Sequence, residues 1–249
     1  MPSCRSRRPL QFSLGTLLLA VTGLSIWLGV QTKAARLQRA IAADIRRLGG
    51  QVYYDWQLDD EDRETGRTEP PGPVWLRRWI GDDYFQTAVT AYLMYVPCRD
   101  GDFPAIENMP ALQTVSLEGT EIGDATLPRL ARLRRLRFLN LSETKITDKG
   151  AAELNRLSCL TTLWICPSDA PTDESVSDAG LKQLRGLREL KSLALGGSGI
   201  TDASIAVLAE FKHLRELYLL DTAITADGWV RLRNSLPDCE VMNGFDEWR

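Results

Sequence analysis

Apolar residues change their spacing in a regular way along the second half of the chain. Residues 136–141 read L-x-x-L-x-L, and alternation of this kind predicts a short strand. Thr147 and Asp148 then offer a helix start, and residues 151–157 place apolar side chains at helical spacing. Four full units and a partial closing one can be aligned, and their opening leucines are Leu112, Leu136, Leu160, Leu190 and Leu214.

Most units are 24 residues long, whereas the third has 30 residues. A repeat of 20–29 residues with this strand-then-helix pattern is typical of a leucine-rich repeat solenoid. We therefore predict an α/β fold, a curved parallel sheet with helices on its convex side. An N-terminal transmembrane helix and an α+β cap are expected to precede it. The extra residues of the third unit lie between Cys166 and Ser175 and are expected to form a loop at the concave rim.

The repeat pattern assigns an inward side to every strand and every helix. Since one unit cannot bury its apolar face alone, these residues are expected to stack on their counterparts in neighbouring units. The predicted inward strand residues are Val115, Leu117, Leu139, Leu141, Leu163, Ile165, Leu193, Leu195, Leu217 and Leu219. The predicted helix residues are Leu127, Leu130, Leu133, Ala151, Leu154, Leu157, Leu181, Leu184, Leu187, Ile205, Leu208, Phe211, Trp229, Leu232 and Leu236.

Two polar positions recur with the leucines. A hydroxyl follows four of the five strands, at Thr120, Thr144, Ser198 and Thr222, where it is expected to bond to the turning backbone. An aspartate stands at each helix start, where a carboxylate accepts hydrogen bonds from free amides and meets the positive end of the helix dipole. We therefore interpret these aspartates as helix caps and not as a catalytic or metal site; they are Asp124, Asp148, Asp178 and Asp202.

The N-terminal region contains an uncharged run, Phe12–Val30. Its 19 residues are about the number that cross a membrane as a helix. A cleaved signal peptide and a buried core helix are the alternatives. However, no A-x-A-like cleavage site follows the run directly, and the run lies outside the repeats. We predict an uncleaved transmembrane helix over residues 12–30.

These patterns divide the chain into four parts. Residues 1–11 form a basic tail, 12–30 the transmembrane helix, 31–96 a juxtamembrane helix and N-terminal cap, and 97–249 the repeat domain with its C-terminal cap. Within the cap we predict a helix over 33–48, strands over 51–56 and 86–96, and a short helix over 74–80 whose Trp75 and Trp79 pack on the cap.

Charge is distributed unevenly between these parts. The chain has a formal net charge of −3, yet residues 1–40 contain six bases and no acid. The acidic remainder argues against nonspecific nucleic-acid binding, which needs a basic surface. Arginines before residue 12 favour a cytoplasmic N-terminus and an extracytoplasmic repeat domain. Bases that follow residue 30 leave the opposite orientation open.

Five widely spaced cysteines without a C-x-x-C pair suggest neither a disulfide framework nor a zinc site. One bridge between Cys159 and Cys166 stays open for an oxidising compartment. His213 is the single histidine and has no nucleophile motif near it, and no phosphate-binding loop or metal-ligand spacing is present. The sequence therefore predicts no enzyme, no metal and no cofactor.

The units also carry a T-x-I-T-D-x-G-L signature, and residues 144–151 match it except that Ala151 stands at the position of the last leucine. This signature resembles the helical repeats of F-box-type and related bacterial leucine-rich repeat proteins. That resemblance implies an interaction module, and some eukaryotic members select substrates for ubiquitin ligases. No F-box precedes the repeats in this sequence, so the resemblance implies only the binding scaffold.

Partner binding is expected on the concave face, where outward strand residues are not needed for the core. Phe138, Trp164 and Tyr218 are expected to form an aromatic row there, either as a protein-binding site or as residues that pack on one another or on the inserted loop. The candidate partner-binding residues are Phe138, Asn140, Trp164, Cys166, Asp169, Glu216 and Tyr218. We expect a membrane-tethered protein-binding module; the alternatives are a ubiquitin-ligase substrate adaptor and a structural envelope protein.

Overall fold

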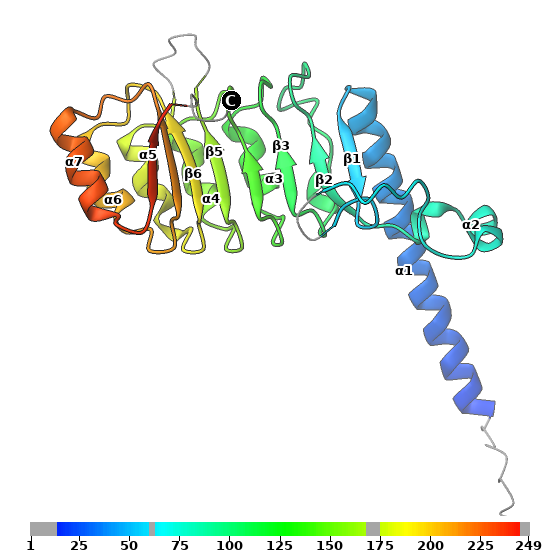
Figure 1. Ribbon diagram of the computed structural model, residues 1–249. Helices are drawn as coiled ribbons and strands as arrows, with labels where there is room; N and C mark the ends of the chain where they lie inside the picture. The colour runs from blue at the N-terminus through cyan, green and yellow to red at the C-terminus, as the bar shows by residue number, and fades with distance from the viewer. Residues whose placement is uncertain (1–13, 60–62, 168–174, 245–249) are drawn as a thin grey trace, which may run out of the picture.

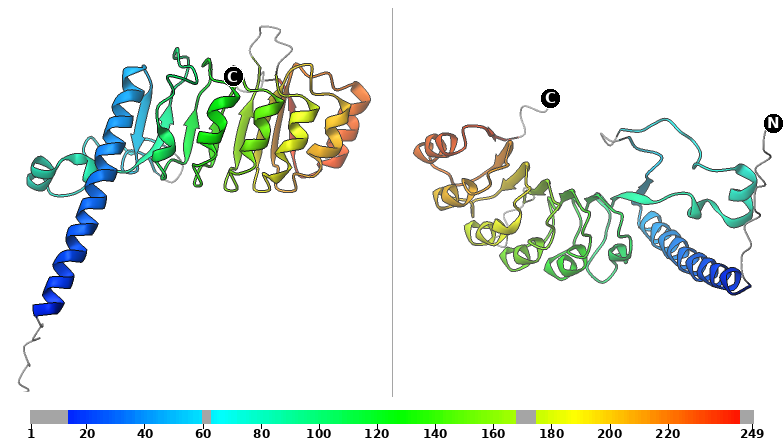
Figure 2. Two further views of the ribbon diagram at one scale, coloured as in Figure 1. Left: turned by 180° about the vertical axis from the view of Figure 1, so that it is seen from behind. Right: turned by 90° about the horizontal axis from the view of Figure 1, so that it is seen from below.

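The computed structural model describes residues 14–59, 63–167 and 175–244. Within them, eight strands form one sheet in the order in which they occur along the chain (Figure 1). Viewed from below, the sheet lines the inner side of an arc, and the repeat helices lie on the outer side (Figure 2). The predicted leucine-rich-repeat-type α/β fold with a parallel sheet is confirmed.

Among the eight described strands, only β1 and β2 pair in the antiparallel sense, and the later pairs are parallel. The strands are β1 (Gln51–Tyr54), β2 (Ala88–Tyr92), β3 (Thr114–Ser116), β4 (Phe138–Asn140), β5 (Thr162–Ile165), β6 (Ser192–Gly196), β7 (Glu216–Leu220) and β8 (Glu240–Asn243). The α-helices are α1 (Leu14–Arg47), α2 (Val74–Ile80), α3 (Leu127–Leu130), α4 (Asp148–Leu154), α5 (Asp178–Gln183), α6 (Ile205–Leu208) and α7 (Ala226–Ser235). Short 3₁₀ turns are η1 (Asp82–Tyr84), η2 (Ile106–Asn108), η3 (Asp124–Thr126), η4 (Leu184–Gly186) and η5 (Asp202–Ser204).

The core is a set of leucine columns that run through the solenoid between the sheet and the helices. Leu139 of β4 lies in register with Leu163 of β5, which is followed by Leu193 of β6 and Leu217 of β7. All four side chains are fully buried. The other predicted inward positions are buried as well, except Trp229, which is half-buried against the core. The repeat register was therefore predictable from the leucine spacing.

The recurring aspartates join neighbouring repeats, which corrects their assignment as caps of their own helices. The carboxylate of Asp124 accepts hydrogen bonds from the backbone N–H (2.9 Å) and the hydroxyl (2.7 Å) of Thr147, one repeat later. Thr147 in turn caps α4, since its hydroxyl accepts from the Lys149 N–H. The same pair of bonds runs from Ser177 to Asp148, from Thr201 to Asp178 and from Thr225 to Asp202.

This aspartate ladder explains the glycine of the T-D-x-G signature. A Cβ added to Gly150 would overlap the carboxylate of Asp124 from the preceding repeat, and one added to Gly180 would overlap Asp148. Where the glycine is replaced by Ser204, the new hydroxyl donates to Asp178 and so uses the same space. The signature thus describes a contact between two repeats.

The N-terminal cap closes the first leucine layer with a helix and a hairpin. Ile41, Ala42 and Ile45 of α1 are buried against the sheet, and Tyr54 of β1 is buried beside them. Because β1 pairs with β2 in the antiparallel sense, the cap reverses the strand direction of the repeats. The hydroxyls of the turns after β3 and β4 behave as predicted, since Thr120 and Thr144 each donate to a carbonyl three residues earlier at 2.6 Å.

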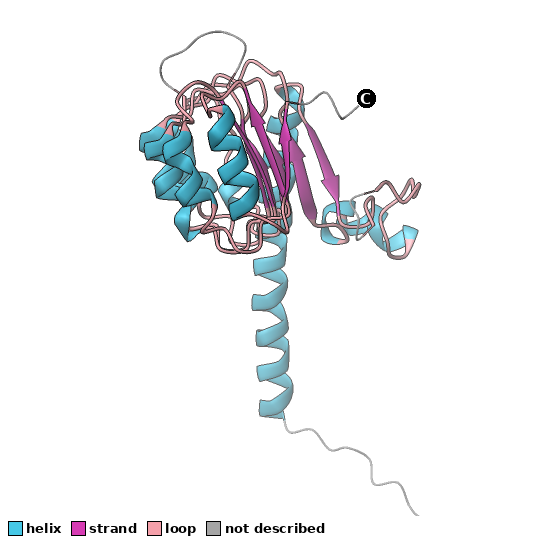
Figure 3. Cartoon of the chain, turned by 60° about the vertical axis from the view of Figure 1, so that its left-hand side comes forward, coloured by secondary structure: helices cyan, strands magenta, loops and turns pink. Residues whose placement is uncertain are grey.

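The first half of α1 leaves the domain as an isolated rod (Figures 1 and 3). Leu18, Leu19 and Leu24 lie on different sides of this helix and are all exposed. One continuous helix thus joins the two segments that the sequence predicted separately, and the tail over 1–11 lies outside the described residues. Among residues 14–59, 63–167 and 175–244, we find no helix with the length and apolar character that a membrane crossing requires.

The short helix α2 forms where predicted, but its aromatic side chains do not pack on the cap. Trp75 is 70% exposed and Trp79 is 83% exposed, whereas Arg77 on the opposite side is buried. Arg77 pairs with Glu69 and Asp82, so this ion-pair set fixes the inner side of α2. The tryptophans are therefore left on the outer side of the helix.

Candidate protein-binding face

The candidate site is the concave face of the sheet, formed by every strand residue that points away from the leucine columns. Strand register places these residues in rows across the solenoid, so Phe138 lies beside Thr162 and Asn140 beside Trp164. From β3 to β8 the rows contain Thr114, Ser116, Phe138, Asn140, Thr162, Trp164, Ser192, Ala194, Gly196, Glu216, Tyr218, Leu220, Glu240 and Met242. These outward positions include no lysine or arginine.

Phe138 and Trp164 form an aromatic pair near the middle of this face. Their ring centroids are 5.3 Å apart and their planes meet at 67°, which is a favourable edge-to-face arrangement. Both side chains are half-buried, so each keeps part of its ring surface toward the concave side. Two members of the predicted aromatic row, Phe138 and Trp164, thus pack on one another and remain partly accessible, and a role of the row in binding stays a prediction.

Tyr218 lies deeper, in a second apolar cluster on the same face. It is 5% exposed and packs with Cys166 and Ala194, while Trp164, Leu220 and Met242 border the cluster. Burial, together with the nearby Glu216 and Glu240 carboxylates, raises the pKa of the Tyr218 phenol. The cluster thus forms an apolar floor beside the aromatic pair, a feature that inward and outward alternation alone does not reveal.

Cys166 belongs to this floor and is a neutral thiol. Its burial raises its pKa to about 12, against a smaller opposite effect from the Ser142 hydroxyl. Cys159 is exposed and Cys166 is buried, and both thiols are free. The two residues flank opposite ends of β5, whose four residues extend roughly 13 Å, so the bridge left open by the sequence does not form.

Asn140 has a structural role at the corner between β3 and β4. It is 2% exposed, its amide N–H donates to Glu118 at 3.0 Å, and its carbonyl oxygen accepts from the Ser142 N–H at 2.9 Å. A partner would have to break these bonds to reach it. Asn140 thus supports Glu118 within this corner, and its contact with a partner stays a prediction.

An acidic corner next to Asn140 was missed by the sequence interpretation. The Tyr95 hydroxyl donates to Glu118 at 2.8 Å and lies 3.5 Å from Glu143. The hydrogen bond to Glu118, with burial as the second cause, raises the pKa of Tyr95 to about 12. Tyr95 lies outside the clear repeats, so no periodic signal connected it with the two glutamates.

The far side of the face is acidic too. Glu216 is exposed at the start of β7 and lies in register with the exposed Glu240 of β8. Asp169, the remaining predicted contact, lies outside the described residues, as does most of the insertion between Cys166 and Ser175. The concave face therefore presents an aromatic pair over an apolar floor, with carboxylates at Glu118 and Glu216 on either side.

Comparison with known proteins identifies the repeat. Residues 133–154 match the family described as Leucine Rich repeat. A search of curated proteins found no match. The match shows a leucine-rich repeat in general, and the F-box-type signature stays a prediction.

Several solved structures are similar to the chain. Internalin C2 from Listeria monocytogenes is 28% identical with a TM-score of 0.44, over 56% of this chain and 54% of that one. A leucine-rich repeat protein of Leptospira interrogans is 24% identical with a TM-score of 0.41, over 55% of this chain and 32% of that one. A second Listeria monocytogenes internalin is 20% identical with a TM-score of 0.39, over 73% and 60%. This chain thus spans about half of internalin C2 and about a third of the Leptospira protein.

Proposed function

We propose that this protein binds a protein partner on the concave face of its solenoid. The observation that carries the proposal is the Phe138–Trp164 pair, which keeps ring surface accessible where the core does not need it. Large aromatic side chains beside an apolar floor are frequent anchors of protein interfaces. Leucine-rich repeat solenoids offer an extended concave surface for such contacts.

The charges of the face favour a partner segment with cationic and apolar side chains. Glu118, Glu216 and Glu240 are acidic residues of this face, and no outward strand residue from β3 to β8 is basic. Complementary charge raises the association rate and discriminates against acidic partners. A segment that places an apolar side chain on Trp164 and a lysine or arginine near Glu216 satisfies both features.

We further propose that the N-terminus tethers this module to a membrane, with the repeat domain on the extracytoplasmic side. The tether is supported by the uncharged run over 12–30 and by the apolar side chains that α1 exposes beyond the domain. The orientation is supported by the three arginines that precede residue 12. A ubiquitin-ligase adaptor would be soluble, so the two functions differ in a simple fractionation. The tethered chain is expected to stay with membranes after an alkaline carbonate wash, and release into the supernatant would contradict the tether.

The concave-face proposal is tested by affinity capture with the full chain from its native cells. Trp164→Ala and Phe138→Ala are expected to lower partner recovery by roughly tenfold or more, as hot-spot truncations do. Lys149→Ala on the convex side is the matched control, because Lys149 is exposed on α4 away from the concave face. If the Trp164 variant recovers the same partners as the control, the concave face is not the binding surface.

A further inference from the structure

The two rims of the solenoid carry opposite charge. We define the basic rim as the loops 131–137, 155–161, 187–191 and 209–215, each of which leads from a helix into the next strand. These loops contain nine arginines or lysines and two glutamates, in a chain whose net charge is −3. The opposite loops, 117–123, 141–147, 197–201 and 221–225, contain four acids and one lysine. The described repeats are thus polarised along the strand direction.

The strongest part of the basic rim is the loop 131–137. It contains Arg132, Arg134, Arg135 and Arg137 without an acidic residue, and all four side chains are exposed. Arg134 donates to the Arg156 carbonyl, and none of the four forms an ion pair with another described residue. A core needs no arginine at these positions, and like charges this close repel one another. The loop is therefore suited to an anionic surface.

The N-terminal helix leaves the domain at this same rim. Gln31 and Ala34 of α1 line one cavity together with Met109 and Pro110, which precede β3. Residue 31 therefore lies at the level where the parallel strands begin, and residues 14–30 extend beyond it (Figure 1). A membrane that holds residues 12–30 would lie directly beneath the basic rim.

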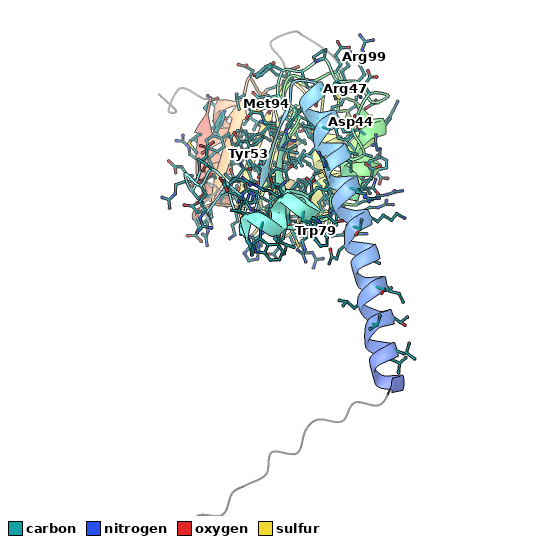
Figure 4. The ribbon with its side chains drawn as sticks, turned by 90° about the vertical axis from the view of Figure 1, so that its right-hand side faces the viewer. Asp44, Arg47, Tyr53, Trp79, Met94 and Arg99 are labelled. Carbon is teal, nitrogen blue, oxygen red and sulfur yellow. The ribbon has the colours of Figure 1, made fainter. Side chains whose placement is uncertain are left out.

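Helix α2 adds two exposed aromatic residues at this end of the molecule. Its Leu76 and Ile80 line the same cavity as Gln31, so α2 lies beside the part of α1 that follows the uncharged run. In Figure 4, Trp79 is seen at the level at which α1 leaves the domain. Exposed tryptophan is favoured at a membrane interface, where its ring is partly in lipid and its N–H reaches water.

We propose that the basic rim, together with Trp75 and Trp79, docks on the surface of an anionic lipid bilayer. This inference rests on the proposed tether, because residues 12–30 decide which rim faces the bilayer. The docked orientation holds the strands upright on the membrane and leaves the concave face open to the side. Clustered arginines beside an anionic bilayer act within about a Debye length, so docking is expected to weaken in high salt.

A native thiol reports on this arrangement. Cys159 is exposed in the loop 155–161 of the basic rim. A nitroxide spin label is attached to Cys159 in the full chain that also carries Cys4→Ser and Cys239→Ser. The labelled protein is reconstituted into vesicles that contain about 30% phosphatidylglycerol, an anionic lipid. Collisions with a nickel-chelating lipid then measure its proximity to the headgroups. The control adds Cys159→Ser/Ser198→Cys, which moves the label to an exposed position on the opposite rim.

We expect the Cys159 label to collide with the nickel lipid several-fold more often than the Ser198→Cys label. This difference in collision rate should become smaller in vesicles of phosphatidylcholine, which has no net charge. It should also become smaller in about 1 M salt, where the Debye length is about 3 Å. The variant Arg132→Glu/Arg135→Glu should reduce it as well. Lys145→Glu/Lys149→Glu changes charge by the same amount near the other rim and should leave the difference unchanged. Brominated lipids should quench the tryptophan fluorescence of the parent chain more strongly than that of the Trp75→Phe/Trp79→Phe variant.

The outcomes separate this proposal from the tether. If the chain stays with carbonate-washed vesicles while both labels collide equally, the docking proposal is wrong and the tether stands. If the chain is released by the wash, the tether is wrong. The docking proposal is also wrong if the collision rate of the Cys159 label does not depend on salt or on lipid charge. It is likewise wrong if a short single-stranded RNA, added at the same phosphate concentration as the lipid, displaces the label from the lipid.

Discussion

The two faces of the sheet follow different rules although they are built from adjacent residues. On the inner face, Leu193 stacks between Leu163 and Leu217, and each is fully buried. One residue earlier, the outer face has Ser192 next to the exposed Glu216. Stacking against the next repeat requires an apolar residue at each inner position. The outer positions differ from repeat to repeat, because they face solvent or a partner. The face that specifies the fold is thus separate from the face available for recognition.

Truncating an inner leucine should have the largest effect on stability. Leu193→Ala is expected to lower the free energy of unfolding by about 2–5 kcal/mol, because it removes buried methyl groups and leaves a cavity between repeats. Thr162→Ala on the outer face should cost clearly less. Urea unfolding followed by circular dichroism measures both changes. Equal losses at the two positions would contradict the division between the faces.

The glycine of the repeat signature should come next. Gly150→Ala favours the helix by its propensity, yet the new methyl group overlaps the Asp124 carboxylate and Leu127. We expect a net loss of about 1–3 kcal/mol, the usual cost of overpacking. Combining Gly150→Ala with Asp124→Ala should cost less than the sum of the single changes. Strict additivity in a double-mutant cycle would contradict the proposed contact between repeats.

A smaller effect is expected from the last bond pair of the aspartate ladder. The hydrogen bonds from Thr225 lower the pKa of Asp202 below its ordinary value, with Arg231 as a further cause. Its contribution to stability is therefore complete above the ordinary aspartate pKa, about 3.9, and is lost as pH falls through the lower folded-state pKa. Asp202→Asn should be less stable than the parent at neutral pH. The urea midpoints of the two proteins should converge toward pH 2, and a constant difference would contradict this role.

The last prediction concerns a residue that is outward by register yet buried. Iodoacetamide at pH 8 should modify Cys159 in the native protein, whereas Cys166 should react only after unfolding, because burial raises its pKa to about 12. Peptide mass spectrometry with and without urea measures this difference. Rapid native modification of Cys166 would show that the apolar floor beneath Tyr218 is open to solvent.

The parts of the fold that repeat could be predicted from the sequence, and the parts that occur once could not. Leu139 and Leu193 were placed correctly because the same position of the repeat recurs several times along the chain with the same neighbouring residues. Trp75 and Trp79 were misplaced because helical spacing alone does not reveal that the Arg77 ion pairs fix the other side of α2. The corner around Tyr95 was missed for the same reason, since it joins a cap residue to glutamates of two repeats.

The aspartate ladder also bears on how such a chain changes in length during evolution. Thr147 lies 23 residues after the aspartate that it bonds, whereas Ser177 lies 29 residues after Asp148 and still makes both bonds. Six additional residues between the two partners therefore leave the stacking of the repeats intact. Residues between a strand and the helix that follows it can therefore be gained or lost during evolution without a change in the neighbouring repeats. The same insertion between a threonine and the aspartate that follows it would break the ladder.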